Sequence, residues 1–174
     1  DFTDESLPTI SVYAKKGQGD TALKILVFSD SHRSLSGMYT AIDRHRPQQV
    51  VHLGDLMCDA EEVAQHYPQL PFCLVPGNCD GWVLSTPVKK EIVLEGISIL
   101  LSHGHRWGVK SSYDSALADA RAIGADILLF GHTHVPLCEQ LEDGLWMMNP
   151  GPARSSYGLI ELQDGHISCR LYQL

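Results

Sequence analysis

Polar residues able to bind a metal follow five apolar segments of this 174-residue chain, each at the point where the segment ends. Aspartate, asparagine and histidine supply a nitrogen and oxygen donor set without thiolate, which suits manganese, iron, zinc or similar divalent ions. The donors are too many for one tetrahedral ion, but they fit two cations that share a bridging carboxylate. Such a pair, about 3.5–4 Å apart, activates a bridging water and clamps a phosphoryl group for in-line attack. The groups are Asp30-Ser31-His32, Gly54-Asp55, Gly77-Asn78, His103-Gly104-His105 and Gly131-His132-Thr133-His134.

Each group follows a run of apolar residues that is typical of a buried strand. Short continuous apolar runs favour strands that are covered on both faces. Ligands of open α/β sheets bind at the carboxyl ends of the strands. We therefore expect the polar groups to converge on one spot, where neighbouring glycines let the backbone turn tightly. The runs are Ile25–Phe28, Val50–Leu53, Phe72–Val75, Ile97–Leu101 and Ile127–Phe130.

Helices and hairpins are predicted between and after these strands. In the first half, strand–helix alternation indicates βαβ units with a largely parallel sheet. In the second half, Asp-Gly and Glu-Gly pairs indicate hairpins at 95–96, 143–144 and 164–165. We therefore predict an α/β fold in which two facing mixed β-sheets are flanked by helices. The expected helices are one capped by Ser34 and ended by Pro47, one with a capping box at Asp59 and Glu62, and one from about Ser112 to Ile123.

The length is enough for one domain with a substantial core. Residues 1–22 are polar, partly acidic and without a periodic pattern, so we predict a flexible N-terminal extension followed by a single folded domain at 23–174. A short strand near Ile10–Tyr13 that docks elsewhere is the alternative for part of this extension.

Composition limits the partners. The formal net charge of −8, without a basic cluster, disfavours general nucleic-acid binding, but bound cations would still let the chain hold a small phosphorylated substrate. No apolar run approaches the roughly 20 residues that span a bilayer, so we expect no membrane association. Five cysteines without a C-x-x-C pair fit a reducing compartment, and we expect a cytoplasmic protein. A homo-oligomer through a sheet edge stays open.

The five motifs together resemble the calcineurin-like metallophosphoesterase superfamily, whose scattered signature is D-x-H, G-D, G-N, H and G-H-x-H. The resemblance extends from about Lys24 to the C-terminus. The short length and the form of 77–80, Gly-Asn-Cys-Asp, are most similar to the YfcE-type branch of small phosphodiesterases, which is related in fold to the retromer metallophosphoesterase-like subunit. This resemblance implies an α/β sandwich of two facing sheets.

The resemblance also implies roles for individual residues. Two divalent ions are implied, with manganese first and zinc, iron, nickel or magnesium as alternatives. Asp55 would bridge them, with Asp30, His32 and His134 on one ion and Asn78, His103 and His132 on the other. We expect the catalytic residues to be Asp55, Asn78, His103 and His105, the last as a candidate general acid.

One position departs from the superfamily pattern. Many members carry histidine after Gly-Asn, whereas this chain has Cys79. A thiol is a weak hydrogen-bond donor with an unperturbed pKa of about 8.5, so it replaces imidazole poorly as a proton donor. Metal-bound water remains the alternative to His105 as the source of the proton.

Three functions compete on these grounds. A binuclear phosphodiesterase that acts through a metal-bridging hydroxide is favoured, and a phosphomonoesterase is its close alternative. A non-catalytic metal-binding interaction module of the retromer-subunit type is the alternative from a different class. Competent ligands fill all the expected positions, which favours the enzyme over the interaction module.

Overall fold

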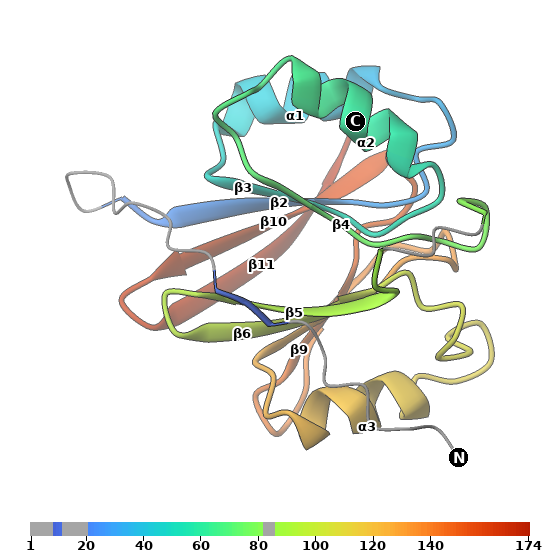
Figure 1. The fold of residues 1–174 in the computed structure, drawn as a ribbon. Helices are drawn as coiled ribbons and strands as arrows, with labels where there is room; N and C mark the ends of the chain where they lie inside the picture. The colour runs from blue at the N-terminus through green and yellow to red at the C-terminus, as the bar shows by residue number, and fades with distance from the viewer. Residues whose placement is uncertain (1–8, 12–20, 82–85) are drawn as a thin grey trace.

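The apolar runs of the sequence form the central strands of two mixed β-sheets that face each other, with helices on the outside (Figure 1). The computed structural model describes residues 9–11, 21–81 and 86–174. Among these residues the strands are β1 (Thr9–Ser11), β2 (Leu23–Phe28), β3 (Gln49–His52), β4 (Phe72–Leu74), β5 (Lys89–Leu94), β6 (Ile97–Ser102), β7 (Ile127–Leu129), β8 (Leu137–Gln140), β9 (Trp146–Asn149), β10 (Ser156–Gln163) and β11 (His166–Gln173). The helices are α1 (Ser36–His45), α2 (Met57–Gln65) and α3 (Asp114–Ala122).

The first sheet has the strand order β11-β10-β2-β3-β4. Its parallel part consists of β2, β3 and β4, which alternate with α1 and α2 along the chain. The antiparallel hairpin of β10 and β11 completes the sheet beside β2. Because β2, β3 and β4 run in the same direction, their carboxyl ends lie at one edge of the sheet.

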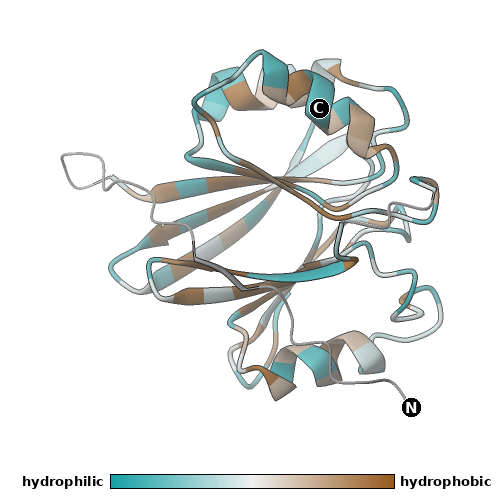
Figure 2. Cartoon of the chain, viewed as in Figure 1, coloured by the Kyte–Doolittle hydropathy of each residue, from teal (hydrophilic) through white to brown (hydrophobic). Residues whose placement is uncertain are grey.

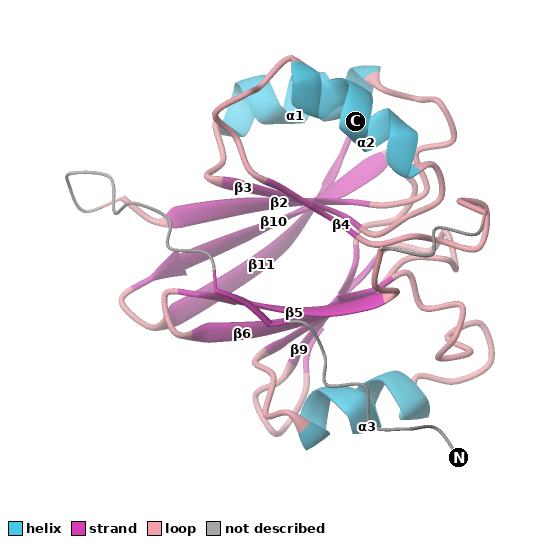
Figure 3. Ribbon diagram, in the orientation of Figure 1, coloured by secondary structure: helices cyan, strands magenta, loops and turns pink. Residues whose placement is uncertain are grey.

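The second sheet has the order β1-β5-β6-β7-β9-β8. Here β5 and β6 form an antiparallel hairpin, while β6, β7 and β9 run parallel to each other. Figure 3 shows the two sheets as opposite layers, with α1 and α2 outside one of them and α3 outside the other. The predicted α/β fold with two facing mixed sheets is therefore confirmed.

Hydrophobic residues recur along the strands of both sheets (Figure 2), and the buried ones pack in separate clusters between the sheets and beneath the helices. In β2, Ile25 and Val27 point between the two sheets, while Leu26 and Phe28 pack in the cluster that contains α1 residues such as Met38. A strand whose successive side chains face opposite sides needs apolar residues at every position when both sides are covered. The continuous apolar runs of the sequence follow from this requirement.

The helices form, but their starts differ from the sequence expectations. Leu35, not Ser34, is the N-cap residue of α1, and it makes no side-chain cap. The expected capping box at Asp59 and Glu62 is wrong, because α2 already begins at Met57. The Asp59 carboxylate instead accepts hydrogen bonds from the loop that follows β2. The third helix is two residues shorter at its start than the expected one.

The expected flexible extension at 1–22 needs one correction. Thr9–Ser11 forms β1 and pairs in parallel with Glu91–Val93 of β5, because the outer edge of β5 offers unpaired backbone groups. Residues 12 and 13, the remainder of the alternative strand near Ile10–Tyr13, lie outside the described residues, as do residues 1–8 and 14–20. The boundary at residue 23 stays a prediction.

None of the described helices combines the length and apolar character that a membrane crossing requires. The cysteines are all free thiols.

Candidate metal centre

The carboxyl ends of strands from both sheets meet at one place and are tied together by backbone hydrogen bonds. Asp30 N, after β2, donates to Gly54 O, after β3, at 2.9 Å. In the opposite sheet, Gly131 N, after β7, donates to His103 O, after β6, at 2.9 Å. The two sheets are then joined at this edge, because His132 N donates to Asp30 Oδ2 at 3.1 Å. The predicted convergence of strand ends is present in the structure.

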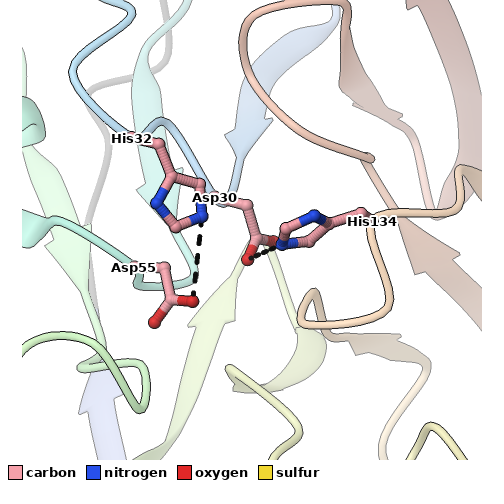
Figure 4. Close-up of side chains that lie close together, drawn as sticks. All are labelled: Asp30, His32, Asp55 and His134. Atoms are coloured by element: carbon pink, nitrogen blue, oxygen red, sulfur yellow. Dashed lines mark hydrogen bonds and ion pairs between the residues drawn. The ribbon is translucent and has the colours of Figure 1, made fainter.

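A first group of donors consists of two buried carboxylates and two exposed imidazoles (Figure 4). Their ligand atoms all lie within 4.8 Å of one another. His134 Nε2 is 3.1 Å from Asp30 Oδ1, and His32 Nε2 is 3.9 Å from Asp55 Oδ2. The two carboxylates are buried, while the side chains of His32 and His134 are 37% and 45% exposed. This first group of donors is therefore accessible from the solvent.

A second group consists of Asp55, His103 and His132, whose ligand atoms also lie within 4.8 Å of one another. His103 Nε2 is 3.5 Å from Asp55 Oδ2 and 3.2 Å from His132 Nδ1. Asp55 is the member that both groups share.

The buried ring of His103 is oriented by a backbone carbonyl. His103 Nδ1 lies 2.8 Å from Leu53 O, and a carbonyl only accepts, so Nδ1 carries the proton. Nε2 is then the ring nitrogen that faces Asp55 and His132. Metal-binding histidines are commonly oriented in this way by a hydrogen bond from the other ring nitrogen.

Five of the donor residues have a left-handed backbone. The φ angles are 51° at Asp30, 42° at His32, 60° at Asp55, 68° at His132 and 60° at His134. Residues other than glycine seldom adopt this conformation, and such strain gathers at functional sites. The surrounding hydrogen bonds hold the chain in a shape that aims several side chains at one point.

The charges around the centre shift the pKa values of its members. Burial works to raise the pKa of the Asp55 carboxyl, but the Cys79 N–H bonded to it and the neighbouring His103 outweigh burial and lower the pKa. Burial, His103 and the Lys110 cation lower the pKa of His132. At neutral pH an ionised Asp55 and a neutral His132 are the forms that bind a cation.

Among the predicted site residues, Asn78, His105 and the departure Cys79 lie outside these two groups. Asn78 is exposed, and its amide nitrogen is 3.6 Å from Cys79 Sγ.

The His105 ring is 5.5 Å from that of His103 and 6.2 Å from that of His132. Its Nδ1 is buried and has no hydrogen-bond partner among the residues that the structure describes. Burial, His103 and Arg106 lower the pKa of His105. Burial and the adjacent Asp55 raise the pKa of the Cys79 thiol.

Sequence reasoning missed a buried relay under the first group. The Gly54 N–H donates to His52 Nδ1 at 3.2 Å, so Nε2 carries the proton of the neutral ring and donates to Ser31 Oγ at 3.0 Å. The Ser31 hydroxyl donates to Asp59 Oδ2 at 2.7 Å, and Arg33 N donates to the same oxygen at 2.7 Å. The sequence predicts Asp59 as part of a helix capping box, and no local pattern links it to Ser31 or His52.

Two further supporting residues carry a signal in the sequence. Asn149 donates to Gly131 O at 3.1 Å and to Thr133 Oγ1 at 2.9 Å, so it holds the loop that bears two of the histidines. The run Asn149-Pro150-Gly151 resembles an element of the superfamily that lies near the site, and this resemblance implies structural support. Asp80, in the loop after β4, accepts hydrogen bonds from the Asp55 loop. Its position directly after Gly77-Asn78-Cys79 is the sequence feature that could have indicated a role near the centre.

The donor set fits divalent cations. Two carboxylates with side-chain exposures of 0% and 4% lie close together, and neither has a lysine or arginine in ion-pair contact among the described residues. Burying such charges is costly unless a cation compensates them. Imidazole nitrogens with a fixed tautomer and carboxylate oxygens are suitable ligands for transition-metal ions.

The calcineurin-like phosphoesterase superfamily domain matches residues 23–164 of the chain. The probable metallophosphoesterase YsnB of Bacillus subtilis is 32% identical over 162 residues, which is 86% of this chain and 90% of YsnB. Phosphodiesterase YfcE of Escherichia coli is 26% identical over 169 residues, covering 80% of this chain and 88% of YfcE. In fold, Chaetomium thermophilum Vps29 matches with a TM-score of 0.75 at 21% identity, covering 90% of this chain and 89% of Vps29.

The match includes strands of both sheets, β2 to β10, and every strand end that carries a donor, and the alignment with YsnB covers most of both chains. The likeness to Vps29 concerns the fold alone. With the two donor groups at the carboxyl ends of the strands, these findings show that the chain belongs to the calcineurin-like phosphoesterase superfamily, among the relatives of YsnB and YfcE.

Proposed function

We propose that the chain is a binuclear metal-dependent phosphodiesterase that hydrolyses a small phosphodiester. The observation that carries this proposal is the position of Asp55, whose carboxylate belongs to both donor groups and can therefore bridge two ions. The diester specificity is supported by the name of the Escherichia coli relative, phosphodiesterase YfcE.

Each ion has its own ligands in this proposal, with Asp55 common to both. When bound, two divalent ions supply a nucleophilic water at neutral pH and stabilise charge on the phosphoryl oxygens. Manganese is the first expectation, and zinc, iron, nickel and magnesium are the alternatives. The ligands are Asp30, His32 and His134 for one ion and Asn78, His103 and His132 for the other.

The protein's own part is to hold these donors ready. Leu53 O keeps the proton of His103 on Nδ1, which leaves Nε2 as a ligand atom. The Cys79 N–H, 2.9 Å from Asp55 Oδ1, stabilises the ionised carboxylate and leaves Oδ2 facing the histidines. The exposed rings of His32 and His134 leave the centre open to a phosphate in solution.

His105 is our candidate for the group that protonates the leaving oxygen. Its ring lies beside those of His103 and His132, at centroid distances of 5.5 Å and 6.2 Å, which places an imidazole next to the second donor group. Cys79 is a poorer donor, because burial and Asp55 raise the pKa of its thiol and strengthen its hold on the proton. We therefore infer that the enzyme favours substrates whose leaving group departs easily without a strong general acid.

The net charge and the cysteines of the chain support a substrate class and a cellular location for this activity. A net charge of −8 supports a small phosphorylated substrate rather than long nucleic acid, and free cysteines support a cytoplasmic location. A phosphomonoesterase uses the same centre and is the alternative. We also propose that the chain can form a homo-oligomer through a sheet edge.

Purified chain with added Mn²⁺ should hydrolyse bis-p-nitrophenyl phosphate faster than p-nitrophenyl phosphate. Asp55→Asn should abolish both activities, whereas Asp143→Asn, at an exposed carboxylate in the turn between β8 and β9, should leave them unchanged. A higher kcat/KM for the monoester would instead support the phosphomonoesterase. Activity that survives in Asp55→Asn, or after complete chelation, would refute the metal mechanism. Metal binding without hydrolysis of either ester would favour the non-catalytic module.

A further inference from the structure

The carboxylate of Asp80 accepts four backbone N–H groups from two loops of the metal centre. Its Oδ2 lies 2.8 Å from Asp55 N and 2.7 Å from Gly77 N. Its Oδ1 lies 3.0 Å from Leu56 N and 2.7 Å from Met57 N. An ionised carboxylate has about four acceptor sites, so these bonds use its full capacity. Asp80 therefore acts on the centre through the backbone and not as a ligand.

The backbone that Asp80 holds is strained and lacks a cap of its own. Asp55 and Leu56 have φ angles of 60° and 70°, in the left-handed region that non-glycine residues avoid. Helix α2 begins at Met57, and its N-cap residue Leu56 offers no side-chain acceptor for the free N–H groups of the first turn. Asp80 supplies that acceptor from another loop, and its negative charge is favourable at a helix N-terminus.

The contact between the two loops is reciprocal. While Asp80 accepts the N–H of Asp55, the Asp55 Oδ1 accepts the N–H of Cys79 at 2.9 Å. Both the backbone and one carboxylate oxygen of Asp55 are thereby fixed. The remaining oxygen, Oδ2, is left 3.5 Å from His103 Nε2 and 3.9 Å from His32 Nε2. The orientation of the shared carboxylate thus depends on the residue that pins its main chain.

From these contacts we infer that Asp80 is a positioning residue, which sets the metal affinity of the centre by holding Asp55 and the Gly77 loop in register. The inference rests on the proposed function, because Asp55 must bind metal for its position to matter. Replacing the carboxylate by an amide puts an NH₂ donor against backbone N–H donors, so Asp80→Asn breaks the clamp with little change in size.

The test is isothermal titration of the metal-free full chain with Mn²⁺. Loss of groups that orient a ligand typically weakens metal binding about 10- to 100-fold, and we expect Asp80→Asn to fall in this range. Asp143→Asn is the matched control, because Asp143 also accepts a backbone N–H, from Leu145 at 3.3 Å, but lies in the β8–β9 turn. The control should bind Mn²⁺ as the wild type does. A high concentration of Mn²⁺ should restore the kcat of Asp80→Asn. A variant that is simply unfolded would not regain activity in this way.

Each outcome decides between the claims. Folded Asp80→Asn that binds Mn²⁺ as tightly as the wild type overturns the inference and leaves the proposed function standing. Wild-type chain that binds no Mn²⁺ overturns the proposed function and the inference with it. If Asp80→Asn does not fold, Asp80→Glu keeps the charge but displaces the carboxylate, and it should also bind Mn²⁺ more weakly. Amide exchange of Leu56 and Met57 in the wild type is an independent check, since unprotected amides would contradict the clamp.

Discussion

Gly131→Ala should damage the centre through a single added methyl group. Gly131 lies two residues after the end of β7, and a Cβ there would collide with Ser29 Oγ and lie 2.8 Å from Asp30 Oδ2 and 2.9 Å from Ser29 Cβ. Both neighbours are fully buried, and the Ser29 hydroxyl donates to Asp30 Oδ2 at 2.6 Å. Since Gly131 is not among the residues with positive φ, alanine adds no backbone strain, and the effect is steric.

The expected loss of stability in Gly131→Ala follows from the displacement of the side chains around the added methyl group. Forcing an extra methyl into a packed interior costs about 1–3 kcal/mol. At roughly 2–4 °C per kcal/mol for a chain of this size, Tm should fall by about 2–12 °C. The larger effect should be on metal binding, because Ser29 and the Asp30 carboxylate have to shift. A disturbed supporting hydrogen bond typically weakens metal affinity about 10- to 100-fold.

The assay is Mn²⁺ titration combined with thermal unfolding, and Gly144→Ala is the control. Gly144 has a φ of 90° and open space around its added Cβ, so alanine costs about 1 kcal/mol or more in backbone strain without touching the centre. Gly144→Ala should lower Tm while Mn²⁺ binds as in the wild type. If Gly131→Ala binds Mn²⁺ with unchanged affinity, the assignment of Asp30 to the centre is wrong.

Three further changes test other parts of the account. Burial lowers the pKa of His52 from 6.5 to about 4, so the unfolded chain binds more protons between these values. The part of the free energy of unfolding that is present above pH 6.5 should then be lost as the pH falls toward 4, by about 3 kcal/mol in all. In denaturation of the metal-free chain, the free energy of unfolding of His52→Gln should depend less on pH in this window than that of the wild type. Cys79→His should accelerate hydrolysis of diesters with poor leaving groups more than that of p-nitrophenyl esters, and equal effects on both would argue against a missing proton donor. Mn²⁺ at 100 times its Kd should stabilise the fold by about 2.7 kcal/mol per independent site, and a chelator should reverse the rise in Tm.

The strands and hairpins could be predicted because their signals are local. A strand covered on both faces must be apolar throughout, as β2 is at Ile25–Phe28. The Asp-Gly pair at 164–165 predicted its turn because both residues adopt positive φ, at 50° and 81°. The convergence of the donors followed from the strand ends.

What the sequence could not show depends on contacts between distant segments. The start of α2 was misplaced because its N-terminal acceptor is Asp80, which lies beyond β4, and not a local cap. Asp59 resembles a capping residue, yet it ends a relay from His52 through Ser31. The strand at Thr9–Ser11 forms only because the edge of β5 is there to pair with it.

The central claim, that two ions share Asp55, is tested most directly by electron paramagnetic resonance of the chain loaded with Mn²⁺. Two ions that share a carboxylate lie about 3.5–4 Å apart, so saturation with Mn²⁺ should give two ions per chain and a spin-coupled signal. Asp55→Asn should remove that coupling. Only isolated Mn²⁺ signals at saturation, or one ion per chain, would contradict the account.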